Sequence, residues 1–336
     1  MLLWCILWSG CARPTETDPE PTPGTTPPET STPTSTSTAT GDTATATATG
    51  DTAAPLDCSV RPQATVVRHH DYVPTAEDFT FDDEGYLWGV STATSGLIRI
   101  PLDGAPELML PNVSSWGRGT RFLPGGDLVV AEPDRGALIR VDRATMGVTT
   151  VRSGLSSPNG VAIDDDGMVF LTQASGRVVR IDPDAGTEQL VYATPLSTDG
   201  VTLAPDYERL YWDSESGEVI TAVVDAEGTV TSGPEVLTTI ATGAGILDGM
   251  TADACGNLYV VKMNGTVVRV LPDGTQETLV TLSSHPAGGF ICAVNFGSGV
   301  GGWERDHLYV MSLQEGLFEV DVGIEGKWEP HYPVGG

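Results

Sequence analysis

The chain has 336 residues and a formal net charge of −28, with 40 glycines, 24 prolines and only 18% charged residues. Its acidity argues against nucleic acid or anionic membrane surfaces as partners. The length suits one large all-β domain with a tail better than a single small domain.

The first ten residues, MLLWCILWSG, are apolar and precede Cys11. Ten residues cannot cross a bilayer, which takes about 20. The stretch is similar to a short bacterial lipoprotein signal peptide (residues 1–10) with Trp8-Ser9-Gly10-Cys11 as its lipobox, although Trp8 and the missing N-terminal Lys or Arg depart from the usual pattern. We therefore expect lipidation of Cys11 and an exported protein at the outer membrane, cell surface or periplasm, touching the membrane through its anchor alone. An ordinary N-terminus with a chance cysteine is the alternative.

Residues 11–56 are almost wholly Thr, Pro, Ser, Ala, Gly, Asp and Glu. This composition has no apolar period and little to bury, so it predicts a disordered linker. Extended chain of this kind covers about 3.1 Å per residue, which gives a reach on the order of 100 Å. A lipid anchor, a long tether and a folded domain over residues 57–336 are the expected layout.

Past the linker, apolar residues alternate with a period of two, which predicts strands. A glycine in the second hairpin turn recurs every 40 to 51 residues, at Gly96, Gly136, Gly176, Gly217, Gly265 and Gly316. Four strands at this spacing are typical of a propeller blade. The sequence therefore predicts an all-β fold, a six-bladed β-propeller of four-stranded blades.

The last repeat ends after its third strand, Leu317 to Val322. We expect Ala64 to Arg68, just before the first blade, to supply its fourth strand, because this closes the ring and removes an exposed sheet edge.

One register position recurs at the start of the first strand in five repeats, eight residues before the first turn. In a propeller these innermost strands line the central channel, so the side chains should meet at one mouth. We call them the ring residues: Glu77, Arg118, Asn159, Asp199 and Asp248. The sixth repeat, which begins near Ile291-Cys292-Ala293, places no charge there.

Three carboxylates crowded in a narrow mouth are costly unless a cation lies among them. Oxygen ligands favour Ca²⁺, with Mg²⁺ and Mn²⁺ as further candidates and Zn²⁺ less suited. The alternative is that Arg118 pairs with the carboxylates and water solvates the rest.

At these positions the chain resembles the gluconolactonase, senescence-marker-protein and luciferin-regenerating-enzyme family of six-bladed propellers. Glu77 in AEDFTFD is similar to the glutamate of EGPxWD, Ser157-Pro158-Asn159 to SPND, and Leu247 to Val260 to PDGMxxDxxGNLYV. Ala131-Glu132 followed by Leu138-Ile139-Arg140 resembles AEHxxRRV. Asp199 stands where the family has a ligating Asn, and Arg118 where many members have an uncharged Asn-Gly.

The resemblance implies a divalent metal bound by Glu77, Asp199 and Asp248, with Asn159 as a contact to the substrate or to a water molecule. We also expect Arg118, although it departs from the family pattern, to contact the substrate. The resemblance further implies hydrolysis of a small lactone, for which a sugar lactone is the candidate, and we expect Asp199 to act as general base. A surface propeller that binds carbohydrate, cell-wall fragments or protein without catalysis is the second hypothesis, because a fold does not fix a function. A monomer is expected.

Cys5 would leave with the signal peptide, and beside Cys11 three cysteines remain, Cys58, Cys255 and Cys292. In the predicted propeller Cys58 and Cys255 lie on the same face and Cys292 on the other. We therefore favour a Cys58–Cys255 disulfide in an oxidising compartment, and three free thiols are the open alternative.

Overall fold

The structure, a computed structural model, describes residues 56–59, 62–243, 245–282 and 290–332. The chain divides into two units, Met1–Ala54 and Pro55–Gly336, and every described residue belongs to the second. The expected signal peptide, Cys11 and nearly all of the expected linker therefore lie outside the described residues. Across the described part of the chain, no helix is long and apolar enough to cross a membrane.

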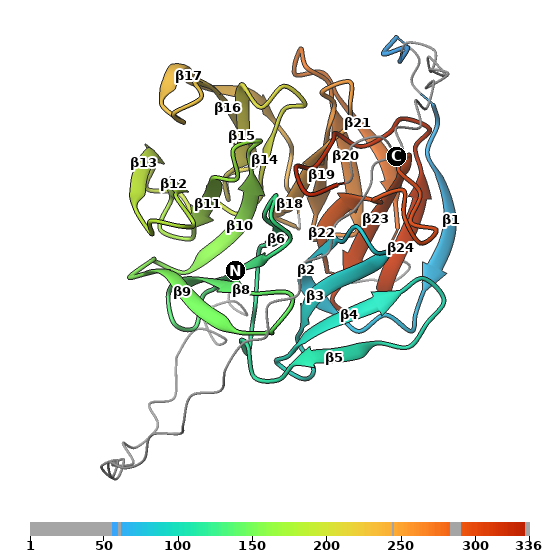
Figure 1. Cartoon of the computed structure of the whole chain (residues 1–336). Coiled ribbons are helices and arrows are strands. Elements are labelled where there is room, and N and C mark those ends of the chain that lie inside the picture. Colours follow the sequence, from blue (N-terminus) through green and yellow to red (C-terminus); the bar gives the residue numbers. More distant parts are fainter. Residues whose placement is uncertain (1–55, 60–61, 244, 283–289, 333–336) are drawn as a thin grey trace, which may run out of the picture. The chain divides into compact units, whose positions relative to one another are not determined.

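The second unit is a six-bladed β-propeller of four-stranded antiparallel sheets, which confirms the predicted fold (Figure 1). Blade 1 contains β2 (Ala76–Phe81), β3 (Tyr86–Ser91), β4 (Leu97–Pro101) and β5 (Glu107–Leu110). Blade 2 contains β6 (Thr120–Phe122), β7 (Leu128–Glu132), β8 (Ala137–Val141) and β9 (Val148–Ser153). Blade 3 contains β10 (Pro158–Ile163), β11 (Val169–Gln173), β12 (Arg177–Ile181) and β13 (Glu188–Ala193). Blade 4 contains β14 (Val201–Leu203), β15 (Arg209–Asp213), β16 (Glu218–Val224) and β17 (Val230–Thr239). Blade 5 contains β18 (Leu247–Ala252), β19 (Leu258–Lys262), β20 (Thr266–Val270) and β21 (Gln276–Thr281). Blade 6 contains β22 (Ile291–Phe296), β23 (His307–Ser312), β24 (Gly316–Asp321) and β1 (Thr65–His70).

The ring is closed by β1, which pairs antiparallel with β24 from Thr65 opposite Asp321 to His70 opposite Leu317. The N-terminal closing strand is thus as predicted, although it begins one residue later and runs to His70. A buried cluster ties it in place: Glu319 of β24 accepts from His70 of β1 (3.0 Å) and lies 2.7 Å from the His307 ring. Closure therefore depends on polar contacts as well as on the backbone ladder.

Neighbouring blades are held together by apolar side chains. The described residues form six buried apolar clusters, and each draws its members from two adjacent blades. Trp88 of blade 1 meets Phe122 of blade 2 edge-on, and Tyr259 of blade 5 meets Phe296 of blade 6. Burying a large apolar side chain contributes about 1.5–3 kcal/mol, so these six interfaces hold the core of the propeller.

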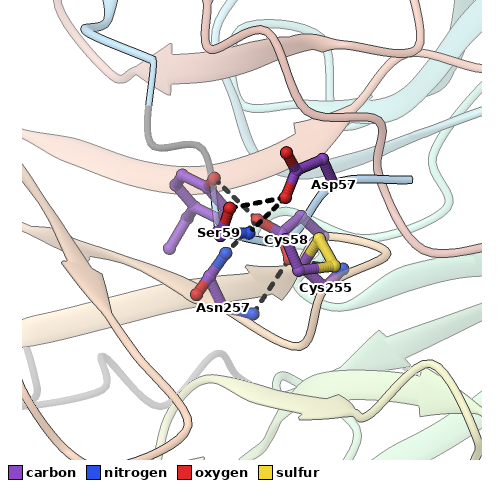
Figure 2. Close-up of a disulfide and its surroundings, with 7 residues drawn as sticks. Asp57, Cys58, Ser59, Cys255 and Asn257 are labelled. Carbon is purple, nitrogen blue, oxygen red and sulfur yellow. Dashed lines mark hydrogen bonds between the residues drawn. A yellow bond between two sulfur atoms is a disulfide. The ribbon is translucent and has the colours of Figure 1, made fainter. Parts of the chain in front are cut away.

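A disulfide joins Cys58, which precedes β1, to Cys255 in the turn between β18 and β19 (Figure 2). This is the pair that the sequence favoured, and Cys292 is a buried free thiol. The turn is fixed by Asp253, whose carboxylate accepts from the backbone N–H groups of Cys255 and Asn257, both at 2.9 Å. The bond encloses a separation of 197 residues, so it fastens the closing segment to blade 5.

The segment after β24 closes one end of the channel, a role that the sequence did not reveal. Lys327 donates its backbone N–H to Ala252 O (3.1 Å), and the His331 ring lies 2.7 Å from Phe81 O. Lys327 and Glu329 form an ion pair of 2.6 Å and line small cavities together with the ends of the inner strands. This end lies opposite the end at which the inner strands begin.

Candidate functional site

The five ring residues line one cavity of about 20 Å³ where the innermost strands begin. Each comes from a different blade: Glu77 (β2), Arg118 (before β6), Asn159 (β10), Asp199 (before β14) and Asp248 (β18). A space of this size holds about one water molecule or one small ion. The structure thus brings the predicted site residues together, while their individual roles stay predictions.

β-Bulges aim several of these side chains. The pairing of inner and second strand shifts between Ala76 and Phe79, between Pro158 and Val161, and between Leu247 and Met250. Glu77, Asn159 and Asp248 each lie inside such a shift. A bulge leaves an extra residue outside the ladder and re-aims its side chain, so these side chains are turned into the cavity.

A glycine follows the ring residue in blades 2 to 5. The next blade approaches so closely at these positions that no side chain fits. A Cβ on Gly119 or Gly160 would lie under 3.0 Å from the carbonyl oxygen of Asn159 or Asp199, respectively. Gly200 and Gly249 meet the carbonyls of Asp248 and Cys292 in the same way. Any side chain there would push the blades apart, so these glycines set the spacing of the ring.

The site is acidic and poorly solvated. Burial raises the pKa of Glu77 to about 7 and that of Asp199 to about 6, although Arg118 lowers both. Burial and the neighbouring carboxylates of Asp199 and Glu77 raise the pKa of Asp248 well above its usual value. The carboxylates therefore resist ionisation together, the situation that a bound cation relieves.

Arg118 is the positively charged member of the ring residues. Its Nε lies 3.4 Å from Glu77 Oε2, yet neither atom has a hydrogen-bond partner among the described residues. Glu77, Asp199 and Asp248 raise the pKa of the guanidinium, against the effect of burial. Arg118 therefore balances part of the acidic charge without directional bonds to it.

Two further carboxylates belong to the site and were missed from the sequence. Asp213, at the end of β15, is buried and accepts from the backbone N–H groups of Asp199 and Gly200, both at 3.2 Å. Asp78 takes the place of the glycine in blade 1 and pairs with Arg121 at 2.7 Å. The sequence signal that could have identified Asp213 is its position as the last residue of the second strand of its blade. The buried Gln173 occupies the same position in blade 3.

The residues present fit a divalent cation by the chemistry of their donors. They offer carboxylate oxygens and the Asn159 amide, which hard cations such as Ca²⁺ and Mg²⁺ prefer, and the buried Glu77 Oε2 has no hydrogen-bond donor among the described residues. In the described part of the chain, however, no three His, Cys, Asp or Glu side chains are already grouped as metal ligands. Ligation by Glu77, Asp199 and Asp248 thus requires their side chains to move closer together.

Comparison with known proteins identifies a family. The family model of the SMP-30/Gluconolactonase/LRE-like region matches residues 170–314. Pentonolactonase XacC of Haloferax volcanii is 31% identical over 274 residues, covering 74% of this chain and 90% of that protein.

Solved structures share the fold at low identity. A calcium-binding protein, regucalcin, from Agrobacterium tumefaciens has a TM-score of 0.62 at 18% identity, covering 81% of this chain and 98% of that one. A gluconolactonase from Xanthomonas campestris has a TM-score of 0.63 at 18% identity, covering 77% and 89%. At this identity the likeness establishes the propeller alone.

Proposed function

Because the chain belongs to the SMP-30/gluconolactonase/LRE-like family, we propose that it is a lactone hydrolase whose active site is the cavity lined by the ring residues. The observation that carries this proposal is the meeting of five blades' polar side chains in one cavity. The pentonolactonase relative supports a sugar lactone as the substrate.

We propose that Glu77, Asp199 and Asp248 hold a divalent cation, with Ca²⁺ favoured by the oxygen donors and by the calcium-binding relative. The bound ion would polarise the lactone carbonyl as a Lewis acid. Oxygen ligands can hold several divalent cations that would act in this way, so the test includes Mg²⁺, Mn²⁺ and Zn²⁺ beside Ca²⁺.

The protein's own groups would handle the proton and the charge. With a pKa of about 6, Asp199 is largely ionised at neutral pH and can accept a proton from the attacking water. The water oxygen bonds to the carbonyl carbon, the ring C–O bond breaks, and the leaving alkoxide takes the proton that Asp199 accepted from the water, which regenerates the Asp199 carboxylate. Arg118 and Asn159 would contact the substrate, and a guanidinium suits the negative charge that grows on the way to the carboxylate product.

The test measures hydrolysis of a panel of sugar lactones, monitored through the acid that the reaction releases, before and after treatment with EDTA. We expect activity to be lost on chelation, restored by one divalent cation, and reduced at least 100-fold in Asp248→Ala. Asp127→Asn is the matched control, because Asp127 pairs with Arg140 outside the cavity. No turnover across the panel, or full activity of Asp248→Ala, would count against the proposal.

One observation favours the second candidate, a non-catalytic binding propeller: Arg118 already neutralises part of the acidic charge by lying beside Glu77. Metal analysis separates the two functions. A purified domain that takes up no divalent cation, even at millimolar concentration, supports the binding function.

We also propose that the protein is an exported lipoprotein anchored through Cys11. The apolar segment at residues 1–10 supports this, and so does the Cys58–Cys255 bond, because disulfides persist in oxidising compartments. Radiolabelled palmitate should enter the full-length chain and be absent from Cys11→Ser, which should also leave the membrane fraction. Equal labelling of both chains would refute lipidation at Cys11.

A further inference from the structure

Two arginines of blade 2 approach the channel and are held in opposite ways. Arg121 donates to Asp78 Oδ2 (2.7 Å), Thr120 O (2.7 Å) and Phe79 O (3.2 Å), so its guanidinium is fixed by directional bonds. Arg118 lies 3.4 Å from Glu77 without a hydrogen bond between Nε and Oε2. Charge rather than a hydrogen bond holds the guanidinium beside Glu77, and such a contact is more easily exchanged for another cation.

The carboxylate that Arg118 faces is one of the three that we propose as metal ligands. Glu77 Oε2 is buried, and Glu77 lines the same cavity as Asp199 and Asp248. A guanidinium cannot lose its charge at accessible pH. A divalent cation on Glu77 would lie close to the guanidinium in a small, poorly solvated cavity and would repel it, so the Arg118 contact and a metal on Glu77 disfavour one another.

We propose that Arg118 is a built-in counter-ion that competes with the divalent cation for Glu77. In the metal-free protein it pairs with Glu77; when the cation binds, it is displaced and its guanidinium becomes available to the substrate. This inference rests on the proposed function, because it takes the metal site as given. It explains why an arginine is tolerated in a ring of acids.

The test measures metal affinity directly, without catalysis, by calorimetric titration of the full domain with Ca²⁺ and Mn²⁺. Arg118→Met removes the charge and keeps the length of the side chain, and it should bind the cation at least 10-fold more tightly. Arg118→Lys keeps the charge and should stay within about 3-fold of the wild type. Arg140→Met removes a charge outside the cavity, between Asp127 and Asp184, and should change affinity less than 2-fold.

A double-mutant cycle with Glu77→Gln separates competition for Glu77 from simple repulsion through space. If Arg118 competes for Glu77, the gain from Arg118→Met should shrink to less than 3-fold in the Gln background. An undiminished gain there, or unchanged affinity of Arg118→Met in the wild-type background, overturns the inference. Circular dichroism of each variant checks folding. Should the Met variant not fold, Arg118→Gln, which also removes the charge, provides the second reading and should show the same gain in affinity; unchanged affinity of that variant would equally overturn the inference.

The outcomes also separate this inference from the proposed function. Metal-dependent lactone hydrolysis with equal cation affinity in wild type and Arg118→Met defeats only the counter-ion role. Failure of every variant to bind either cation defeats both the counter-ion role and the metal site.

Discussion

Replacing Glu77 by Gln should stabilise the metal-free protein at alkaline pH. Burial raises the pKa of Glu77 from 4.5 to about 7, so the folded state holds this proton more tightly than the unfolded chain does. Folding stability therefore falls as pH rises between these values, and the loss is complete above about pH 7. One pKa unit corresponds to about 1.4 kcal/mol, which makes the cost of ionising Glu77 on the order of 3 kcal/mol.

Gln mimics the protonated side chain and removes this cost. We expect Glu77→Gln to exceed the wild type by about 2–3 kcal/mol at pH 8 in EDTA, and to match it at pH 4.5. Guanidinium unfolding at both pH values measures the difference. Glu215→Gln, at an exposed position, is the matched control and should shift stability by less than about 0.5 kcal/mol.

Adding a divalent cation at pH 8 should reverse the order of stability, so that the wild type becomes more stable than Glu77→Gln. The wild type gains stability by binding the ion to its folded state, whereas the Gln variant has lost a ligand. The reasoning is refuted if Glu77→Gln is no more stable than the wild type at pH 8 without metal. That result would mean that Arg118 already compensates the buried carboxylate fully.

Three further predictions concern the scaffold. Gly160→Ala should abolish cation binding in titration and lower the melting temperature, because its Cβ would strike Asp199 O; Gly125→Ala, where a Cβ meets nothing, is the control. Cys255→Ser should cost about 2–5 kcal/mol in denaturant unfolding, and a reductant should weaken the wild type equally; equal stability of oxidised and reduced protein would contradict this. Burial raises the pKa of Glu319, but hydrogen bonds from the histidine rings lower it further and hold it below its usual value. The ionised carboxylate therefore stabilises the fold above about pH 4.5, and this stabilisation is lost as pH falls. Glu319→Gln should therefore be about 1–3 kcal/mol less stable at pH 7 and show a flatter acid limb; a wild-type acid limb would refute it.

The blades and the ring were predictable because their signals are local. The chain repeats a period of two, turn glycines and one eight-residue offset. In a propeller, residues that share a register in different blades lie close together in space. The same reasoning identified the closing strand, because the last repeat lacks its own outer strand.

What the sequence did not reveal depends on contacts between unlike segments. Asp213 lies in a different register from the ring residues, and it matters because two backbone N–H groups of the chain before β14 point at it. The segment after β24 lies outside the repeats, so no repeated pattern predicts its position, yet Lys327 and Glu329 line a cavity at one end of the channel. The sequence offered pairing of Arg118 with the carboxylates only as an alternative to a metal, because residue spacing does not determine which cation lies beside Glu77.

The crowding of carboxylates is tolerated because the backbone that carries them is fixed by other means. Glycines let the inner strands approach, and Gly119 and Gly160 donate to the carbonyls of the next blade at 2.9 and 3.2 Å. Six apolar clusters and the disulfide hold the blades in the described part of the chain without help from the ring residues. Conservative changes of ring side chains should therefore alter ion binding and proton affinity while leaving the propeller folded, so their effects report on the chemistry of the site.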